Sequence, residues 1–294
     1  MKNIKDQIQS AVDIFKSGNL LEAEKLTKKL IKENPNIAFI YNLMGLILTG
    51  QKKYDEAIKI YKKGLQTDSS FGMIYNNLGL IFYNQKNNIK EAEKFYFKSI
   101  SADKNIGEPY NNLGSLYNSL GKYEEAVRYY KKAIEINSKF FYAHFNLGST
   151  NITIGNIDEA KKNLREAIKL NPNFYQAHRA LSRITNYKND KKLFEELLYV
   201  YNNFKSKNIQ HKIDLGFSLG KAYEDLNDFD NSFYHYHEAN NFHRKNINFK
   251  INDEIKKFNK IKKNYTKSLI NKFNGCGNTK TSPIFIVGMP RSGT

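Results

Sequence analysis

The sequence predicts an all-α protein, a solenoid of antiparallel helix pairs, and two observations support this fold class. Residues 110–133 have the spacing of two short amphipathic helices separated by a glycine. Two series of small residues then recur along the chain at intervals of 34 or 35 residues. The first series is Gly45, Gly79, Gly114 and Gly148, and the second is Ala23, Ala57, Ala92, Ala126 and Ala160. Such a period is typical of stacked helical repeats, each of which contacts only its neighbours.

Within residues 110–133, small and large residues are placed as two packed helices require. Gly121 is expected to end the first helix, because glycine adopts a positive φ without a Cβ clash. Gly114 and Ala126 are expected where the two backbones approach closely. Tyr117 and Tyr130 would then fill the space beside them.

This pattern resembles the tetratricopeptide repeat. Large residues open the first helices, Leu-Gly pairs follow them, and tyrosines recur in the second helices. They are Tyr41, Tyr75 and Tyr110; Leu78-Gly79, Leu113-Gly114 and Leu147-Gly148; and Tyr61, Tyr96 and Tyr130. Pro35 and Pro172 each close a repeat, whereas the tryptophan of the family is replaced by tyrosine or histidine. The resemblance implies a right-handed superhelix with five repeats in residues 1–174, the first of them a weaker copy.

The pattern loosens after residue 174. Residues 175–245 are expected to hold a divergent helix pair, with no alanine where its packing needs one, and then a helix pair like the earlier repeats. Residues 246–281 are expected to form an amphipathic helix and a linker. The apolar positions of that helix are Ile251, Ile255, Phe258, Ile261 and Tyr265. The helix is expected to cap the open end of the solenoid, which would otherwise expose an apolar face.

The last residues, 282–294, have a different character. Residues 283–287 form an unbroken apolar run, typical of a buried parallel strand. The loop that follows is bounded by Gly288 and Gly293 and nearly meets the phosphate-binding pattern G-x-x-x-x-G-K-[ST]. Thr294 stands where that pattern needs lysine, which argues against an ordinary nucleoside triphosphatase or a nucleotide-binding regulator. We expect here a C-terminal stub of an α/β P-loop-like domain.

The segment PIFIVGMPRSGT resembles the 5′-phosphosulfate-binding loop of sulfotransferases. It is most similar to the loop of tyrosylprotein sulfotransferases and of bacterial proteins that join tetratricopeptide repeats to a sulfotransferase domain. The resemblance implies 3′-phosphoadenosine-5′-phosphosulfate (PAPS) as co-substrate, bound by Arg291, Ser292, Gly293 and Thr294. Arg291 would offset charge that develops on the bridging oxygen, and the two hydroxyls would donate hydrogen bonds. The alternative is a chance occurrence of a strand and a glycine-bounded loop.

The chain ends inside this motif. The rest of the expected sheet, the 3′-phosphate site and the base that deprotonates the acceptor cannot be assigned in residues 1–294. We therefore expect this polypeptide to be catalytically inactive on its own and to be a fragment of a longer protein.

Asparagines recur two residues before three of the glycines, at Asn77, Asn112 and Asn146, whereas Leu43 breaks the series. This ladder resembles the one in the repeats of O-linked N-acetylglucosamine transferase, and the resemblance implies that its amides hold the backbone of an extended protein segment. Amides suit this role because each offers both donors and an acceptor. The alternative is the general asparagine richness of the chain.

Charge and composition exclude some classes of function. Lys and Arg outnumber Asp and Glu by 47 to 29, a net charge of +18. The lysines are interleaved with glutamates, which favours solvated helix faces over an anionic partner. No nucleic-acid-reading motif and no apolar run of membrane-spanning length is present, so neither partner is expected. The single cysteine excludes an internal disulfide, His235, His237 and His243 form a poor metal set, and a cytoplasmic location is expected.

Two functions remain. In the first, the repeats are the substrate-binding arm of a PAPS-dependent sulfotransferase, which transfers a sulfuryl group to a hydroxyl of a protein tyrosine or a sugar. In the second, the chain is a protein–protein interaction scaffold of stacked repeats without enzymatic activity. The sequence assigns neither the acceptor nor an oligomeric state.

Overall fold

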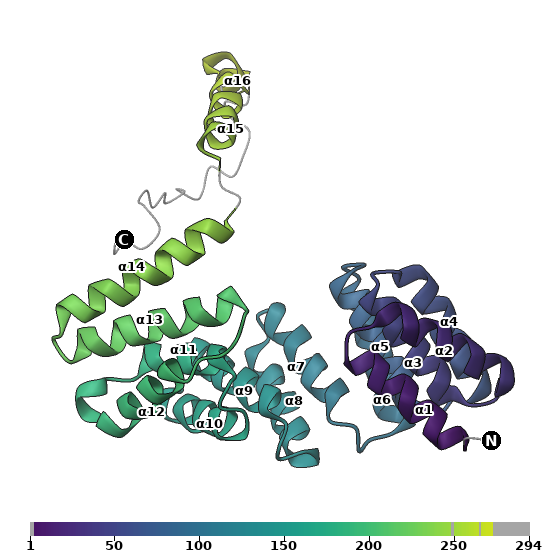
Figure 1. Ribbon diagram of the computed structural model, residues 1–294. Helices are drawn as coiled ribbons and strands as arrows, with labels where there is room; N and C mark the ends of the chain where they lie inside the picture. The colour runs from purple at the N-terminus through teal and green to yellow at the C-terminus, as the bar shows by residue number, and fades with distance from the viewer. Residues whose placement is uncertain (1–2, 248–249, 265, 273–294) are drawn as a thin grey trace. The chain divides into compact units, whose positions relative to one another are not determined.

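The computed structural model describes residues 3–247, 250–264 and 266–272, and every element in these residues is helical (Figure 1). The all-α repeat array that the sequence predicts is confirmed. The strand and loop expected in residues 282–294 lie outside the described residues. The chain divides into two units, Met1–Phe242 and His243–Thr294, and each is described by itself.

The first unit begins with consecutive helix pairs. The two helices of a pair lie against each other, and the second helix of each pair also packs on the first helix of the next pair. The pairs are α1 (Ile4–Lys16) with α2 (Leu20–Glu33), α3 (Ala38–Gly50) with α4 (Tyr54–Thr67), α5 (Gly72–Asn84) with α6 (Ile89–Ala102), α7 (Glu108–Ser119) with α8 (Tyr123–Ile136), and α9 (Phe141–Thr153) with α10 (Ile157–Leu170).

The regular packing changes after α10. Here α11 (Tyr175–Ile184) is followed by a short 3-10 turn, η1 (Tyr187–Asn189), and by α12 (Lys191–Asn202). The backbone of α11 packs mainly on α13 (Ile209–Asp225) rather than on α12. Helix α14 (Phe229–Asn246) then runs beyond the boundary of the first unit.

Three glycines of the series, Gly45, Gly79 and Gly114, lie where a tyrosine ring of the second helix presses on the backbone of the first, and at Gly148 the side chain of Leu164 takes the place of the ring. A Cβ added at Gly79 would lie 2.5 Å from Cε1 of Tyr96, and one at Gly114 would lie 2.6 Å from Cε1 of Tyr130. Both tyrosines are buried. Glycine is therefore required at these positions by close approach, as the sequence predicts.

Gly121 ends α7 as expected. It has φ of +73°, and its N–H donates to the carbonyl of Asn118. The N–H of Lys122 donates to the carbonyl of Tyr117. This pair of bonds satisfies carbonyls that the end of the helix would otherwise leave unpaired, and it directs the chain into α8.

The described helices of the second unit are α15 (Ile251–Asn264) and α16 (Lys267–Lys272). The apolar positions expected on α15 do share one face, but Ile251, Ile255, Phe258 and Ile261 are all exposed. Tyr265 lies outside the described residues. That α15 caps the repeat array stays a prediction.

Candidate functional site

The predicted asparagines form a ladder of hydrogen bonds between the first helices of successive pairs. Nδ2 of Asn77 on α5 donates to Oδ1 of Asn42 on α3, over 2.8 Å. The bonds from Asn112 to Asn76 (2.8 Å) and from Asn146 to Asn111 (2.9 Å) repeat this arrangement along α5, α7 and α9. We call these six side chains the amide ladder.

Sequence reasoning identified the donors of the ladder and missed the acceptors. Each acceptor stands one residue before the donor position of its own helix, so that Asn76-Asn77 and Asn111-Asn112 are consecutive pairs. The bonds join residues 35, 36 and 35 positions apart. The Asn-Asn dipeptides at the repeat interval were the signal that could have revealed the acceptors.

The ladder keeps hydrogen-bonding capacity that the protein does not use. Within the described residues, Oδ1 of Asn112 and Oδ1 of Asn146 accept no hydrogen bond, and each Nδ2 uses one of its two hydrogens. Both side chains are half-buried, whereas Asn77 is buried with 7% of its surface exposed. The rungs of Asn112 and Asn146 can therefore be reached from solvent, with one donor and one acceptor each.

A hollow of about 220 Å³ adjoins Asn77 and lies between α3, α4 and α5. Tyr61 contributes to its lining, and the Tyr61 hydroxyl is fully buried and has no hydrogen-bond partner among the described residues. Its polar neighbours are Asn77 and Thr49, and the Thr49 hydroxyl donates instead to the carbonyl of Gly45. Burial raises the pKa of Tyr61 well above its ordinary value, so the hydroxyl keeps its proton and can donate.

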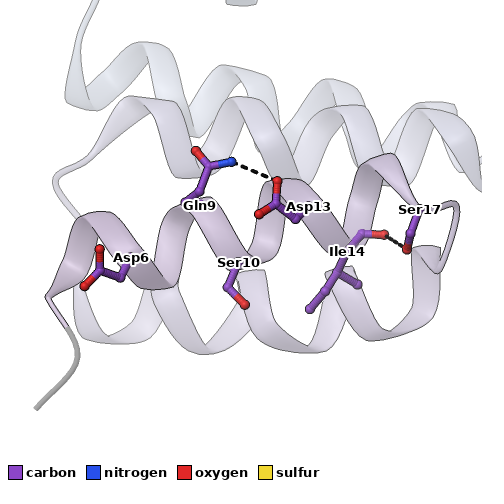
Figure 2. A pocket seen from close by; sticks show the side chains of 6 residues that line it. All are labelled: Asp6, Gln9, Ser10, Asp13, Ile14 and Ser17. Carbon is purple, nitrogen blue, oxygen red and sulfur yellow. Dashed lines mark hydrogen bonds between the residues drawn. The ribbon is translucent and has the colours of Figure 1, made fainter.

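A second hollow, on α1, lacks the features of a binding site. Figure 2 shows that its lining comes from one helix and its end, with Asp6 and Asp13 on the exposed face. Asp13 accepts a 2.8 Å hydrogen bond from Gln9, and the Ser17 hydroxyl donates to the carbonyl of Ile14. Among the described residues no group of three or more histidine, cysteine or acidic side chains is placed to hold a metal ion.

The residues expected to bind PAPS, Arg291, Ser292, Gly293 and Thr294, lie outside the described residues. The fit of the co-substrate to them therefore stays a prediction. None of the described helices combines the length and hydropathy that a bilayer-spanning segment needs.

Comparisons with known proteins identify the repeats. Two models of the tetratricopeptide repeat match residues 108–140 and residues 74–106 and 141–174, and a third, of the TPR repeat, matches residues 45–86. Residues 45–106 and 108–174 of this chain are tetratricopeptide repeats. The matched ranges hold every residue of the amide ladder except Asn42, and they give no support to a sulfotransferase domain. No curated protein matches the chain.

Solved structures of other proteins share the fold. The type IV pilus biogenesis factor PilW gives a TM-score of 0.57 at 18% identity, over 71% of this chain and 98% of that chain. The C-terminal part of a TPR repeat-containing protein from Cytophaga hutchinsonii gives 0.53 at 20% identity, over 77% and 92%. The Cut9–Hcn1 hetero-tetramer of APC/C gives 0.58 at 15% identity, over 81% and 43%. At these identities the similarity concerns the fold alone.

The donor and acceptor positions of the amide ladder are occupied by apolar residues in the repeat interface before the ladder and in the one after it. In the repeat before the ladder, Ile8 and Leu43 belong to one apolar cluster. In the repeat after it, Phe145 and Ala180 pack against another. The donor position and the acceptor position are therefore either both amides or both apolar. No amide at these positions faces an apolar partner across a repeat boundary.

Proposed function

We propose that this chain is an interaction scaffold that holds an extended segment of a partner protein along the amide ladder. The observation that carries the proposal is the unused donor and acceptor at Asn112 and at Asn146. A peptide bond of an extended chain presents one N–H and one C=O, which an amide can pair at once. Recognition of this kind reads the partner's backbone and leaves its side chains free to vary.

The fixed geometry of the ladder favours binding. Each amide is held by its neighbour in the adjacent repeat, so its rotamer is set before the partner arrives. A preorganised side chain loses less conformational entropy on binding than a free one. At the buried rung, the protonated Tyr61 hydroxyl beside Asn77 offers a further donor to a polar group that enters the hollow.

The test uses the full chain and a peptide selected on it from a random linear library. Alanine at Asn77, Asn112 and Asn146 is expected to weaken the affinity for this peptide, measured by calorimetry, at least tenfold, since each lost hydrogen bond costs about 1 kcal/mol. The matched control replaces Asn202, Asn240 and Asn241, which are exposed on α12 and α14. Circular dichroism establishes that both variants are folded. Unchanged affinity in the ladder variant would remove the proposal.

A second candidate function rests on the sequence of residues 283–294, PIFIVGMPRSGT. Its resemblance to the sulfotransferase loop supports a role for the repeats as the substrate-binding arm of a PAPS-dependent enzyme. Transfer of radiolabelled sulfate from PAPS to a tyrosine peptide or a sugar tests it. We expect residues 1–294 alone to be inactive and a longer natural chain to be active, with activity lost in Arg291→Ala. An inactive longer chain would leave only the scaffold.

A further inference from the structure

A larger groove, of about 810 Å³, lies between the second helices α10 and α12, with α11 beneath it. It is formed by other elements than those that carry the amide ladder. Its walls are mainly apolar, and they come from Ile168, Pro172, Leu181, Leu193 and Val200. This volume lies within the range of pockets that bind small ligands.

The groove exists because α12 departs from the repeat pattern. Phe194 and Tyr201 stand one period after Ala160 and Ala167, the small residues that let α10 approach its partner. Bulky side chains at these positions keep the backbone of α12 away from α11. The backbone of α11 accordingly packs mainly on α13, and the space between α10 and α12 stays open.

A buried histidine lines this groove. His178 has 5% of its surface exposed, and its Nε2 lies 3.0 Å from the carbonyl oxygen of Pro172. A carbonyl can only accept, so Nε2 carries the proton of the ring. Burial lowers the pKa of His178, which keeps the ring neutral near pH 7. Nδ1 is then a hydrogen-bond acceptor.

The equivalent histidine of the preceding repeat shows what His178 lacks. His144 stands one period earlier, and both of its ring nitrogens face polar groups: Nε2 lies 3.1 Å from the carbonyl oxygen of Ser138, and Nδ1 lies 3.3 Å from the side-chain amide of Asn163. The residue one period after Asn163 is Leu197, which is buried and has no polar group to offer. Nδ1 of His178 consequently has no hydrogen-bond partner among the described residues, although the ring contributes to the lining of the groove.

The charges at the rim largely neutralise one another. Arg165 forms an ion pair with Asp190, and Lys169 lies 3.5 Å from a carboxylate oxygen of Glu166. Lys192, Glu195 and Glu196 also line the groove and form no ion pair among the described residues, so the lining has three cations and three carboxylates in all. The groove thus offers apolar walls, a rim of balanced charge and one neutral acceptor at depth. This chemistry fits an uncharged ligand that has an apolar body and a hydrogen-bond donor at its end.

We propose that the groove binds a tyrosine side chain of a partner protein, with the phenol hydroxyl donating to Nδ1 of His178. A phenol combines a flat apolar ring, which would lie against Leu181 and Leu193, with a donor at its far end. A serine hydroxyl has no such apolar body, and a lysine would lose the hydration of its charge. The site is a second one, and it does not depend on the amide ladder.

The test is an NMR titration of the full chain with p-cresol, the side chain of tyrosine, and with toluene, which lacks the hydroxyl. We expect p-cresol to bind roughly five- to tenfold more tightly, as a single buried hydrogen bond predicts. His178→Phe should remove this preference, whereas the matched variant His144→Phe should keep it. Equal binding of both probes, or a preference that survives His178→Phe, would overturn the proposal.

A second variant keeps the test decisive if His178→Phe fails to fold. Val200→Trp fills the groove from its half-buried wall without changing the imidazole. It should abolish p-cresol binding while the far-UV circular dichroism stays that of the parent chain. Unchanged binding in a folded Val200→Trp chain would place p-cresol elsewhere and reject the groove as its site.

Discussion

Nδ2 of Asn146 lies 2.9 Å from Oδ1 of Asn111, a residue of the preceding repeat. The bond joins α9 to α7, two first helices that also lie against each other. One period further along, the equivalent pair is Phe145 and Ala180, and both of these residues are apolar. A slip of one repeat against its neighbours would place an amide opposite an apolar side chain, which costs the desolvation of an unpaired polar group. The ladder thus favours one order of stacking as well as offering a surface for binding.

The pairing of Asn111 with Asn146 can be measured by a double-mutant cycle. Asn111→Phe alone leaves a half-buried amide without its acceptor and should lower the free energy of unfolding by about 1–2 kcal/mol. Adding Asn146→Ala recreates the apolar pair Phe145 and Ala180, so the double variant should lose less than the sum of the single variants. Urea unfolding should give a coupling free energy of about 1 kcal/mol. A coupling near zero would mean that the two amides act independently.

Gly79 is expected to reject even a methyl group. The Cβ of Gly79→Ala would lie 2.5 Å from the ring of Tyr96, which is fully buried. The clash should cost about 1–3 kcal/mol, more than the gain of about 1 kcal/mol in helix propensity. Gly50→Ala is the matched control in α3, because its nearest neighbour is the flexible end of Leu20, at 3.2 Å. Thermal unfolding should show a lower Tm for Gly79→Ala only; equal Tm values would contradict the role of close approach.

The sequence was sufficient to predict the repeat array because the close approach of two helices demands small residues at fixed intervals. Gly79 and Gly114 therefore show the period directly. The acceptors of the ladder were missed because each donor pairs with a residue that stands one position before the equivalent donor position in the preceding repeat. A search for the same residue at equivalent positions of each repeat finds the donors and does not show this pairing. The absence of alanine in residues 188–204 indicated loose packing. The groove beside His178 depends on where α12 lies, and the spacing of residues in the sequence does not show that position.

The buried His178 should make the protein less stable in mild acid. Burial lowers its pKa from 6.5 in the folded chain, so the unfolded chain binds the proton more readily. The stability that the neutral ring supplies is complete above about pH 6.5 and is lost as the pH falls through the lower folded pKa. His235, whose pKa burial also lowers, adds to the same loss.

Urea midpoints measured between about pH 7.5 and pH 5 check this expectation. His178→Gln should flatten the fall in the midpoint with decreasing pH, because glutamine does not titrate. The matched variant His243→Gln, at an exposed position of α14, should leave the fall unchanged. A fall of the same size in all three proteins would exclude His178 as its source.

Asp214 and Arg179 form the ion pair on which the divergent part of the array should depend most. The Asp214 carboxylate is buried, with 2% of the residue exposed. One of its oxygens accepts from Arg179 at 2.8 Å and from Gln210 at 3.1 Å, and the other has no partner among the described residues. Arg179 also covers the ring of Phe217, with its guanidinium carbon 4.8 Å from the ring centroid. Arg179→Leu would leave a buried carboxylate without its cation, which should cost about 3–5 kcal/mol.

The outcome of Arg179→Leu is separated from a general effect of lost charge by two further variants. Lys132→Leu breaks an exposed pair with Glu135 and should change the free energy of unfolding by less than about 1 kcal/mol. Adding Asp214→Leu to Arg179→Leu removes the unpaired carboxylate, so the double variant should recover much of the loss. If Arg179→Leu unfolds in urea at the same midpoint as the parent chain, the buried carboxylate must be satisfied by solvent or by Gln210. The pair would then have no part in holding α11 against α13.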